Sequence, residues 1–527
     1  MNHSLWVLVF AVACKPGGSG PNGTDTDASD DPFTGVCSLE VEVSWNDDFP
    51  AVPEFSFSPA STGNTVTLTL DDATHTHRWR LDVEAGQSTV AVPFDPGVRA
   101  SYLLEVDTAD GACLGGGDFE NGAYDEGALD STGQASGRRD FFLLPIKVEA
   151  AGEWVVVWNE SGEPLWRYSH STNLRSAELD DAGRGVWLLE LQDGFVGGFD
   201  EDAGTDLRLV SWTGEVLETL PMPAGHHDWQ IGDGRLGDNG TVTLLGREHM
   251  EEIEQMCSEI VYGDTVQSID VSDGEPDILY GTVADGFPTP LGCEALNMGI
   301  QSGDGVAYSY FNGMQRFGDT YGVSASGLVH GLVLGGSDGT WNFVSSDANS
   351  DLNVVPAHGD LPTTIAQAPH SVQCTEGIDW GDGVSADPGI LTCVAYNRRQ
   401  FGGGPMAASC DTVDLFRADP ANAQVDYLAT FPPVDFAGDR WAGCSTTNHH
   451  GNVGIVGEPN PDGDGITRLA LFAAASGAIT TVVVTSTPTG TEIALDYVIA
   501  PSQEGSVNGW FATPVDRFGA SHEVFPN

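Results

Sequence analysis

The sequence predicts an all-β protein in which a small N-terminal β-sandwich precedes a six-bladed β-propeller. The chain has 527 residues, with 67 glycines and 29 prolines that punctuate short apolar runs. No long helical pattern occurs between these turns. After residue 139, a Gly- or Asp-containing turn followed by a short apolar strand and a hairpin recurs along the chain. Four antiparallel strands per repeated unit are typical of propellers.

The first residues predict export. A short apolar run, residues 5–13, ends in small residues before Cys14. It is too short to cross a bilayer as a helix, and it is typical of a bacterial lipoprotein signal over residues 1–14 with Cys14 as the lipidated residue. An ordinary cleaved secretory signal is the alternative, and the absence of Lys or Arg before the run suggests a true start upstream.

Residues 15–36 predict a disordered acidic tether. We therefore expect an exported lipoprotein at the outer membrane or cell surface, facing the periplasm or the extracellular medium. Its contact with the membrane would be the lipid anchor only.

The charge balance excludes polyanionic partners. Basic residues number 20 and acidic residues 77, which gives a net charge of -57 at pH 7. Such a surface repels nucleic acid and anionic membranes, and it suits solubility in a salty or extracellular medium. We expect no nucleic-acid partner.

The cysteines predict disulfides. Of nine cysteines, eight remain after Cys14, an even number in an exported chain. Eight cysteines allow about 105 pairings, and no Cys-x-x-Cys pair favours zinc. Order along the chain suggests the pairs Cys37–Cys113, Cys257–Cys293, Cys374–Cys393 and Cys410–Cys444.

Alternating apolar and polar positions define the sandwich, residues 37–110. Its predicted strands include residues 39–43, 65–70, 78–83 and 101–106. Residues 111–138 are rich in Gly and Asp and are predicted to form a linker. Residues 139–527 are predicted to form the propeller. Six glycine-led strands, starting near Gly152, Gly185, Gly240, Gly305, Gly389 and Gly451, are expected to surround one axis.

Two histidine segments each precede such a strand. His226-His227-Asp228 comes before the strand at Gly240, and His370 comes before the strand at Gly389. If the strands are equivalent parts of a repeat, the histidines lie at the same depth of one cavity.

These segments resemble the arylsulfotransferase family, periplasmic enzymes independent of the usual nucleotide sulfate donor. The resemblance rests on residues 225–228, 262–266 and 369–373, and extends over about residues 150–460. It implies a six-bladed propeller, often with an N-terminal β-sandwich. It also implies sulfate transfer from an aryl sulfate to a phenolic acceptor, with His370 as the nucleophile.

Two departures put activity in doubt. The family's His-x-Asn motif reads Ala295-Leu296-Asn297, so the Asn is present and the His is not. The stretch at residues 308–312 lacks the family's arginine. Part of the group that would hold the sulfate is therefore lost. This loss weakens the expectation that the chain is an active enzyme of this type.

The chemistry also follows from the residue types. A neutral imidazole can accept a sulfuryl group, as we expect for His370. His226 or His227 can serve as acid/base for the phenol, because a histidine pKa lies near working pH. Asn297 can donate to a sulfuryl oxygen, and Arg398 with Arg399 can supply local positive charge.

Other interpretations stay open. Each histidine segment also fits a structural hydrogen-bond network. A non-catalytic lipoprotein propeller that binds a ligand or surface partner is the alternative function, and a calcium-dependent hydrolase or lactonase is a third. We expect no cofactor, with structural calcium left open by residues 460–465, although Leu471 stands where a calcium loop has Glu. His75 and His77 could bind a stray metal ion, but we interpret them as part of a surface strand.

Overall fold

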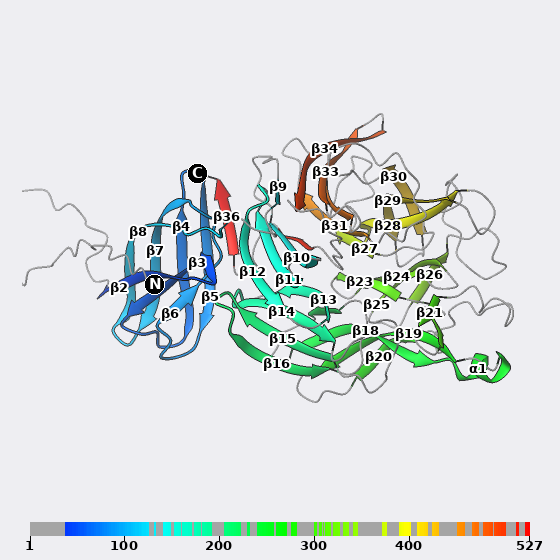
Figure 1. The fold of residues 1–527 in the computed structure, drawn as a ribbon, viewed down its shortest axis with the longest axis horizontal. Helices are drawn as coiled ribbons and strands as arrows, with labels where there is room; N and C mark the ends of the chain where they lie inside the picture. The colour runs from blue at the N-terminus through cyan, green and yellow to red at the C-terminus, as the bar shows by residue number, and fades with distance from the viewer. Residues whose placement is uncertain are drawn as a thin grey trace, which may run out of the picture. The chain divides into compact units, whose positions relative to one another are not determined.

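The structure is a computed structural model, and it divides into two compact units, each nearly all β (Figure 1). The first unit contains β1–β8 and β36, and the second contains β9–β35. Among the described residues, no helix is both long and apolar enough to span a membrane. The structure describes residues 37–125, 131–132, 141–148, 152–159, 161–170, 173–180, 182–191, 205–222, 229–231, 240–257, 260–270, 276–281, 300–302, 305–307, 309, 311–317, 320–326, 330–336, 341–345, 371–376, 389–401, 408–419, 424–431, 451–458, 466–473, 478–487, 490–501, 513–515 and 522–526.

The first unit is a β-sandwich of two sheets, as the alternating pattern predicted. The larger sheet has the strand order β1 (Cys37–Ser38), β8 (Gly111–Glu120), β7 (Arg99–Thr108), β4 (Asn64–Asp71), β5 (His75–Val83), β36 (His522–Pro526). The smaller sheet has the order β2 (Glu40–Asn46), β3 (Phe49–Ser58), β6 (Thr89–Ala91).

Aromatic side chains fill the space between the two sheets. Phe55 of β3 is fully buried, and its ring lies edge-on to Tyr102 of β7 at 5.2 Å and to Phe119 of β8 at 5.7 Å between centroids. The two sheets approach closely at Gly115 of β8, where an added Cβ would lie 2.5 Å from the Val41 side chain. Glycine is therefore required there by packing and not by backbone conformation.

Two predicted boundaries are wrong. Residues 111–120, assigned to a linker, form β8 of the sandwich. Residues 522–526, assigned to the propeller, form β36, which pairs with β5 and appears in red among the blue strands of the first unit (Figure 1). The periodicity of β8 was obscured by its glycines, and pairing between residues this far apart carries no local signal.

Within its described part, the second unit has six sheets, each built on four antiparallel strands. In chain order they are β10 (Phe141–Val148), β11 (Gly152–Asn159), β12 (Pro164–His170) with β35 (Thr513–Val515) beside β10; β13 (Asn173–Leu179), β14 (Gly185–Leu191), β15 (Thr205–Ser211), β16 (Val216–Met222); β17 (Trp229–Ile231), β18 (Thr241–His249), β19 (Val261–Asp270), β20 (Pro276–Gly281); β23 (Phe311–Phe317), β24 (Thr320–Ser326), β25 (His330–Gly336), β26 (Trp341–Ser345); β27 (Ser371–Glu376), β28 (Leu391–Phe401), β29 (Ala408–Asp419), β30 (Gln424–Phe431); and β31 (Gly451–Glu458), β32 (Ile466–Ala473), β33 (Ala478–Thr487), β34 (Gly490–Pro501).

Three smaller elements join these sheets. The hairpin β21 (Ile300–Ser302) and β22 (Gly305–Ala307) adds to β19, and β9 (Ser131–Thr132) adds to β34. Helix α1 (Glu251–Cys257) connects β18 and β19.

The first strands of the sheets approach one another in a fixed order. β13 contacts β17, which contacts β23, and the series continues through β27 and β31 to β35. β35 in turn pairs with β10, and β10 contacts β13. This is a propeller-type arrangement, as the fold class predicted.

The glycine-led strands are not the first strands of their sheets, with one exception. Gly152 and Gly185 begin β11 and β14, and Gly240 and Gly389 precede β18 and β28, all of them second strands. Of the six glycines, Gly451 alone begins a first strand, β31. Gly305 begins β22, in the hairpin that adds to β19.

Neighbouring sheets pack face to face through apolar cores. One core joins β14, β15 and β16 to β18 and β19, and includes Trp187, Leu207, Leu244 and Ile269, each at most 1% exposed. A second joins β18, β19 and β20 to β23, β24 and β25. The hairpins predicted at residues 209–217, 266–280 and 469–483 are confirmed.

Two of the predicted disulfides are confirmed. Cys37 and Cys113 join the paired strands β1 and β8, and Cys374 and Cys393 join β27 and β28 where they face each other in the ladder. Cys257 is also disulfide-bonded. Cys293 and Cys444 lie outside the described residues, and Cys410 lies on β29.

We predict that Gly115→Val destabilises the sandwich. The added side chain would overlap Val41 and Leu39, and overpacking a core costs about 1–3 kcal/mol. Thermal unfolding measured by circular dichroism should show a lower Tm. Ala112→Val, an exposed position on the same strand, is the matched control and should unfold as the wild type does. Equal Tm values for the two variants would contradict the packing described here.

Candidate functional site

Most residues that the sequence singled out lie outside the described residues. These are Cys14, His226, His227, Asn297 and His370. Arg398 and Arg399 lie on β28, opposite Asp411 and Cys410 of β29. The roles expected for all seven residues stay predictions.

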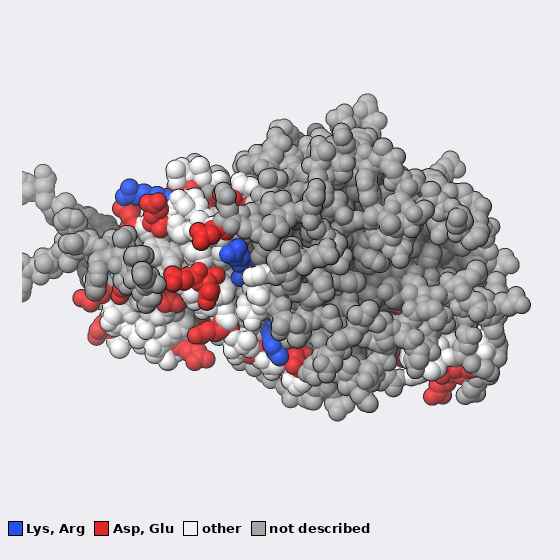
Figure 2. Space-filling view, in the orientation of Figure 1, with Lys and Arg blue, Asp and Glu red and all other residues white. Residues whose placement is uncertain are grey.

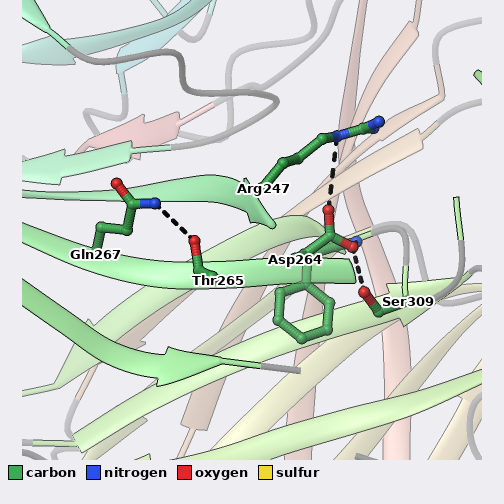
Figure 3. Close-up of polar contacts among 6 residues, drawn as sticks. Arg247, Asp264, Thr265, Gln267 and Ser309 are labelled. Carbon is green, nitrogen blue, oxygen red and sulfur yellow. Dashed lines mark hydrogen bonds and ion pairs between the residues drawn. The ribbon is translucent and has the colours of Figure 1, made fainter. Parts of the chain in front are cut away.

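A buried ionic network lies where β18, β19 and the entry to β23 meet (Figure 3). Asp264 of β19 is 1% exposed, and its Oδ1 lies 3.7 Å from Nε of Arg247 on β18. Its Oδ2 accepts hydrogen bonds from the Ser309 hydroxyl at 2.5 Å and from the Phe311 backbone N–H at 2.9 Å. One carboxylate therefore joins two neighbouring sheets of the second unit.

Strand pairing and aromatic contacts fix the arginine. Arg247 and Asp264 face each other in the ladder of β18 and β19, and the Arg247 side chain is 9% exposed. Its guanidinium lies over the Tyr262 ring, 5.6 Å from the centroid, in a cation–π contact. A planar guanidinium held this way is a fixed positive charge and not a mobile surface cation.

His249 extends the network toward solvent. Its Nδ1 lies 2.8 Å from Glu254 Oε1 of α1, and its ring lies 5.0 Å from that of Tyr262. Glu254 Oε1 also accepts from the Val261 backbone N–H at 3.0 Å. With a side chain 38% exposed, His249 forms an ion pair when protonated.

A glycine keeps the adjacent part of β18 close to its neighbour. Gln267 donates to the Thr265 hydroxyl at 2.7 Å, and both residues are buried on β19 (Figure 3). A Cβ at Gly246 would lie 2.6 Å from Gln267 Cδ and 2.8 Å from Thr265 Oγ1. Gly246 therefore leaves the room in which this amide packs, next in sequence to Arg247.

The two sheets that follow the predicted histidine segments carry arginines at matching positions. Trp229, the first residue of β17, pairs with Leu244, and Arg247 lies three residues further along β18. Ser371, the first residue of β27, pairs with Tyr396, and Arg399 lies three residues further along β28. In an antiparallel pair, both arginines are therefore at the strand end from which the first strand enters.

This arrangement suits recognition of an anion. Arginine is the side chain best matched to sulfate or phosphate oxygens, because its N–H groups form a planar fork. Positive charge is rare in this chain, and the described face of the first unit shows many acidic and few basic side chains (Figure 2). A fixed positive charge would thus stand out against the negative electrostatic potential of the protein surface.

Sequence reasoning missed Arg247, Ser309 and His249. Asp264 lay in a quoted motif, residues 262–266, but no partner was assigned to it. Their position in the sequence could have pointed to them. Arg247 and His249 lie at the end of an apolar strand, in a chain that has only 20 Lys and Arg residues. Among the described residues, the cluster able to hold a metal ion lies elsewhere, at Asp72, His77 and Asp95.

No protein-family model and no curated protein matches the sequence. Three of the solved structures that resemble it are β-propeller-like folds. The N-terminal domain of Nup159 has a TM-score of 0.30 at 10% identity, covering 72% of this chain and 86% of that one. Oligogalacturonate lyase in complex with manganese has a TM-score of 0.28 at 11% identity, covering 84% and 99%. An ACO/RPE65 chimera has a TM-score of 0.30 at 8% identity, covering 91% and 97%. Likenesses at these TM-scores establish neither a family nor a function.

We predict that Asp264→Asn strongly destabilises the second unit. Replacing the carboxylate by an amide breaks the buried ion pair with Arg247, and breaking a buried ion pair costs about 3–5 kcal/mol. Urea unfolding followed by fluorescence measures the loss. Arg247→Met combined with Asp264→Asn should be less destabilised than Asp264→Asn alone, because no charge is left unpaired.

The matched control is Asp277→Asn, an exposed carboxylate on β20 of the same sheet. It should unfold with the wild-type midpoint. If Asp264→Asn behaves like this control, Asp264 does not hold the two sheets together.

Proposed function

We propose that this chain is an exported sulfuryl transferase of the arylsulfotransferase type. It would move sulfate from an aryl sulfate ester to a phenolic acceptor through a histidine intermediate. The proposal combines the resemblance of three sequence segments to that family with the arrangement of the strands that follow them.

One observation carries the proposal. The segments containing His226-His227 and His370 directly precede β17 and β27, each the first strand of a four-stranded sheet. Both sheets carry an arginine three positions beyond the partner of that first residue. The proposal is that the two histidine segments converge on one face of the propeller, because the first strands of propeller blades enter from the same face.

The transfer needs two displacements at sulfur. In the first, a ring nitrogen of His370 attacks the sulfur, an N–S bond forms, and the bond from sulfur to the aryl oxygen breaks. The departing phenolate takes a proton from His226 or His227. In the second, the acceptor phenol gives its proton to the same histidine, its oxygen attacks sulfur, and the N–S bond breaks. Over the two displacements, one SO₃ group passes from donor to acceptor and one proton passes from acceptor to donor. No cofactor is required.

Arg247 and Arg399 are the residues suited to replace the lost part of the group that would hold the sulfate. Residues 308–312 lack an arginine, yet Ser309 of that stretch donates to the carboxylate that holds Arg247. A guanidinium there would favour the charge on sulfuryl oxygens, assisted by Asn297 and by Arg398 or Arg399.

The second candidate is a non-catalytic propeller that binds a ligand or surface partner. It is favoured by Ala295 in place of a histidine, and by the pairing of Arg247 with Asp264, which neutralises part of its charge. In either case we propose anchoring through Cys14 to the outer membrane or cell surface.

We predict that the purified chain turns over p-nitrophenyl sulfate continuously only when a phenol acceptor is present, and without one releases at most one p-nitrophenol per chain. His370→Ala should reduce the rate by at least about 10³-fold, because the covalent route is removed. His227→Ala should slow it by about 10²–10⁴-fold, the usual contribution of a general acid/base. Absorbance of the released p-nitrophenolate measures both.

His170→Ala is the matched control, because His170 ends β12, the strand at the far edge of its sheet from β35. It should keep the wild-type rate. If the wild-type chain turns over none of several aryl sulfates, the transferase proposal fails and the binding protein remains. Equal rates for His370→Ala and the wild type would exclude His370 as the nucleophile.

A further inference from the structure

A second set of chemically competent side chains gathers in the first unit, independent of the proposed transferase. Asp72 follows β4, His77 lies on β5, and Asp95 lies between β6 and β7. One ligand atom from each lies within 4.8 Å of the others. We propose that Asp72, His77 and Asp95 form a zinc site in the β-sandwich.

Burial of these side chains favours a bound cation. Asp72 is 8% exposed and His77 is 2% exposed, and Asp95 is partly buried. Two carboxylates so close together repel each other, and burial raises the free energy of each charge. A divalent cation would neutralise both carboxylates while a neutral imidazole completes the set.

The Asp72 carboxylate is already oriented by its own turn. Its Oδ1 accepts from the Thr74 backbone N–H at 2.6 Å, the Thr74 hydroxyl at 2.7 Å and the His75 backbone N–H at 2.8 Å. These bonds fix the orientation of the carboxylate. Hydrogen-bonded ligand carboxylates of this kind are usual around protein-bound metals.

His77 is held by a second buried histidine. Its Nδ1 lies 3.1 Å from Nε2 of His522 on β36, and the two rings are stacked at 5.3 Å. His522 is fully buried and also stacks on Trp79 at 4.1 Å. In the His77 tautomer whose Nδ1–H donates to His522, the lone pair of His77 is on Nε2, and this is the form that would bind a metal.

The segment that carries Asp95 is fixed by a buried amide. The side chain of Asn121 donates to the backbone carbonyls of Phe94 at 2.9 Å and Asp95 at 3.1 Å. The Asp95 backbone is therefore positioned before any ion binds. Preorganised ligands lose less entropy on binding and raise affinity.

The ligand set favours zinc. One imidazole and two carboxylates, with a water molecule in the fourth position, suit the tetrahedral preference of Zn²⁺. Calcium prefers six to eight oxygen ligands, and its chemistry does not use imidazole. The ion would join three segments of the sandwich directly, and β36 through His522, so its expected role is structural.

The test is zinc binding by the full-length chain after removal of metal with EDTA. Zinc titration against a fluorescent chelator should give a site with one equivalent per chain in the wild type. Asp95→Asn should weaken this site by at least tenfold, and His522→Gln should weaken it by about 10–100-fold, the usual effect of losing a partner of a metal ligand. Zinc should raise the Tm of the wild type and not that of Asp95→Asn.

Asp82→Asn is the matched control, because Asp82 is exposed on β5, the strand that carries His77. It should bind zinc as the wild type does. Equal zinc affinity for Asp95→Asn and Asp82→Asn would overturn the proposal, and so would a site that binds calcium but not zinc. Circular dichroism spectra matching the wild type would show that Asp95→Asn remains folded, so that lost binding reports the ligand.

Discussion

Backbone pairing by two short strands near the C-terminus completes a sheet in each unit. Residues 513–515 pair with Phe141–Leu143 of β10, and β36 pairs along β5 from His75 to Trp79. Without them, β10 and β5 would be edge strands with unpaired N–H and C=O groups. The sheet of β10, β11 and β12 would then have three strands. The series of strand contacts that runs from β13 to β31 would also lack its contact with β35. The chain therefore cannot complete either unit until its last residues are in place.

The same constraint underlies both proposed sites. In the second unit, contacts between successive first strands bring sheets far apart in sequence into one arrangement, and Asp264 adds a polar link between β19 and the entry to β23. A buried carboxylate needs its donors and its cation, so this link is specific in a way that apolar packing is not. In the first unit, β36 places His522 against His77. Each site therefore depends on long-range pairing that no single segment specifies.

The sequence predicted what depends on local periodicity. Alternation identified β2, β4, β5 and β7, and the hairpins of the second unit, because one face of each strand is buried. It did not identify β8, where five of ten residues are Gly or Ala and the apolar face is interrupted. The sequence also could not predict strand register or long-range partners. Arg247 faces Asp264, and His522 contacts His77, because distant segments pair as strands. Cysteine order along the chain, in contrast, predicted two disulfides correctly, Cys37–Cys113 and Cys374–Cys393.

The central claim is that His370 carries the sulfuryl group covalently. The direct measurement is the mass of the protein and its peptides after brief exposure to an aryl sulfate with no acceptor, under conditions that preserve N–S bonds. The account predicts one added SO₃ group per chain, on the peptide that contains His370, and its loss when a phenol is added. An unmodified protein that nevertheless transfers sulfate, or a group on any other residue, would contradict it.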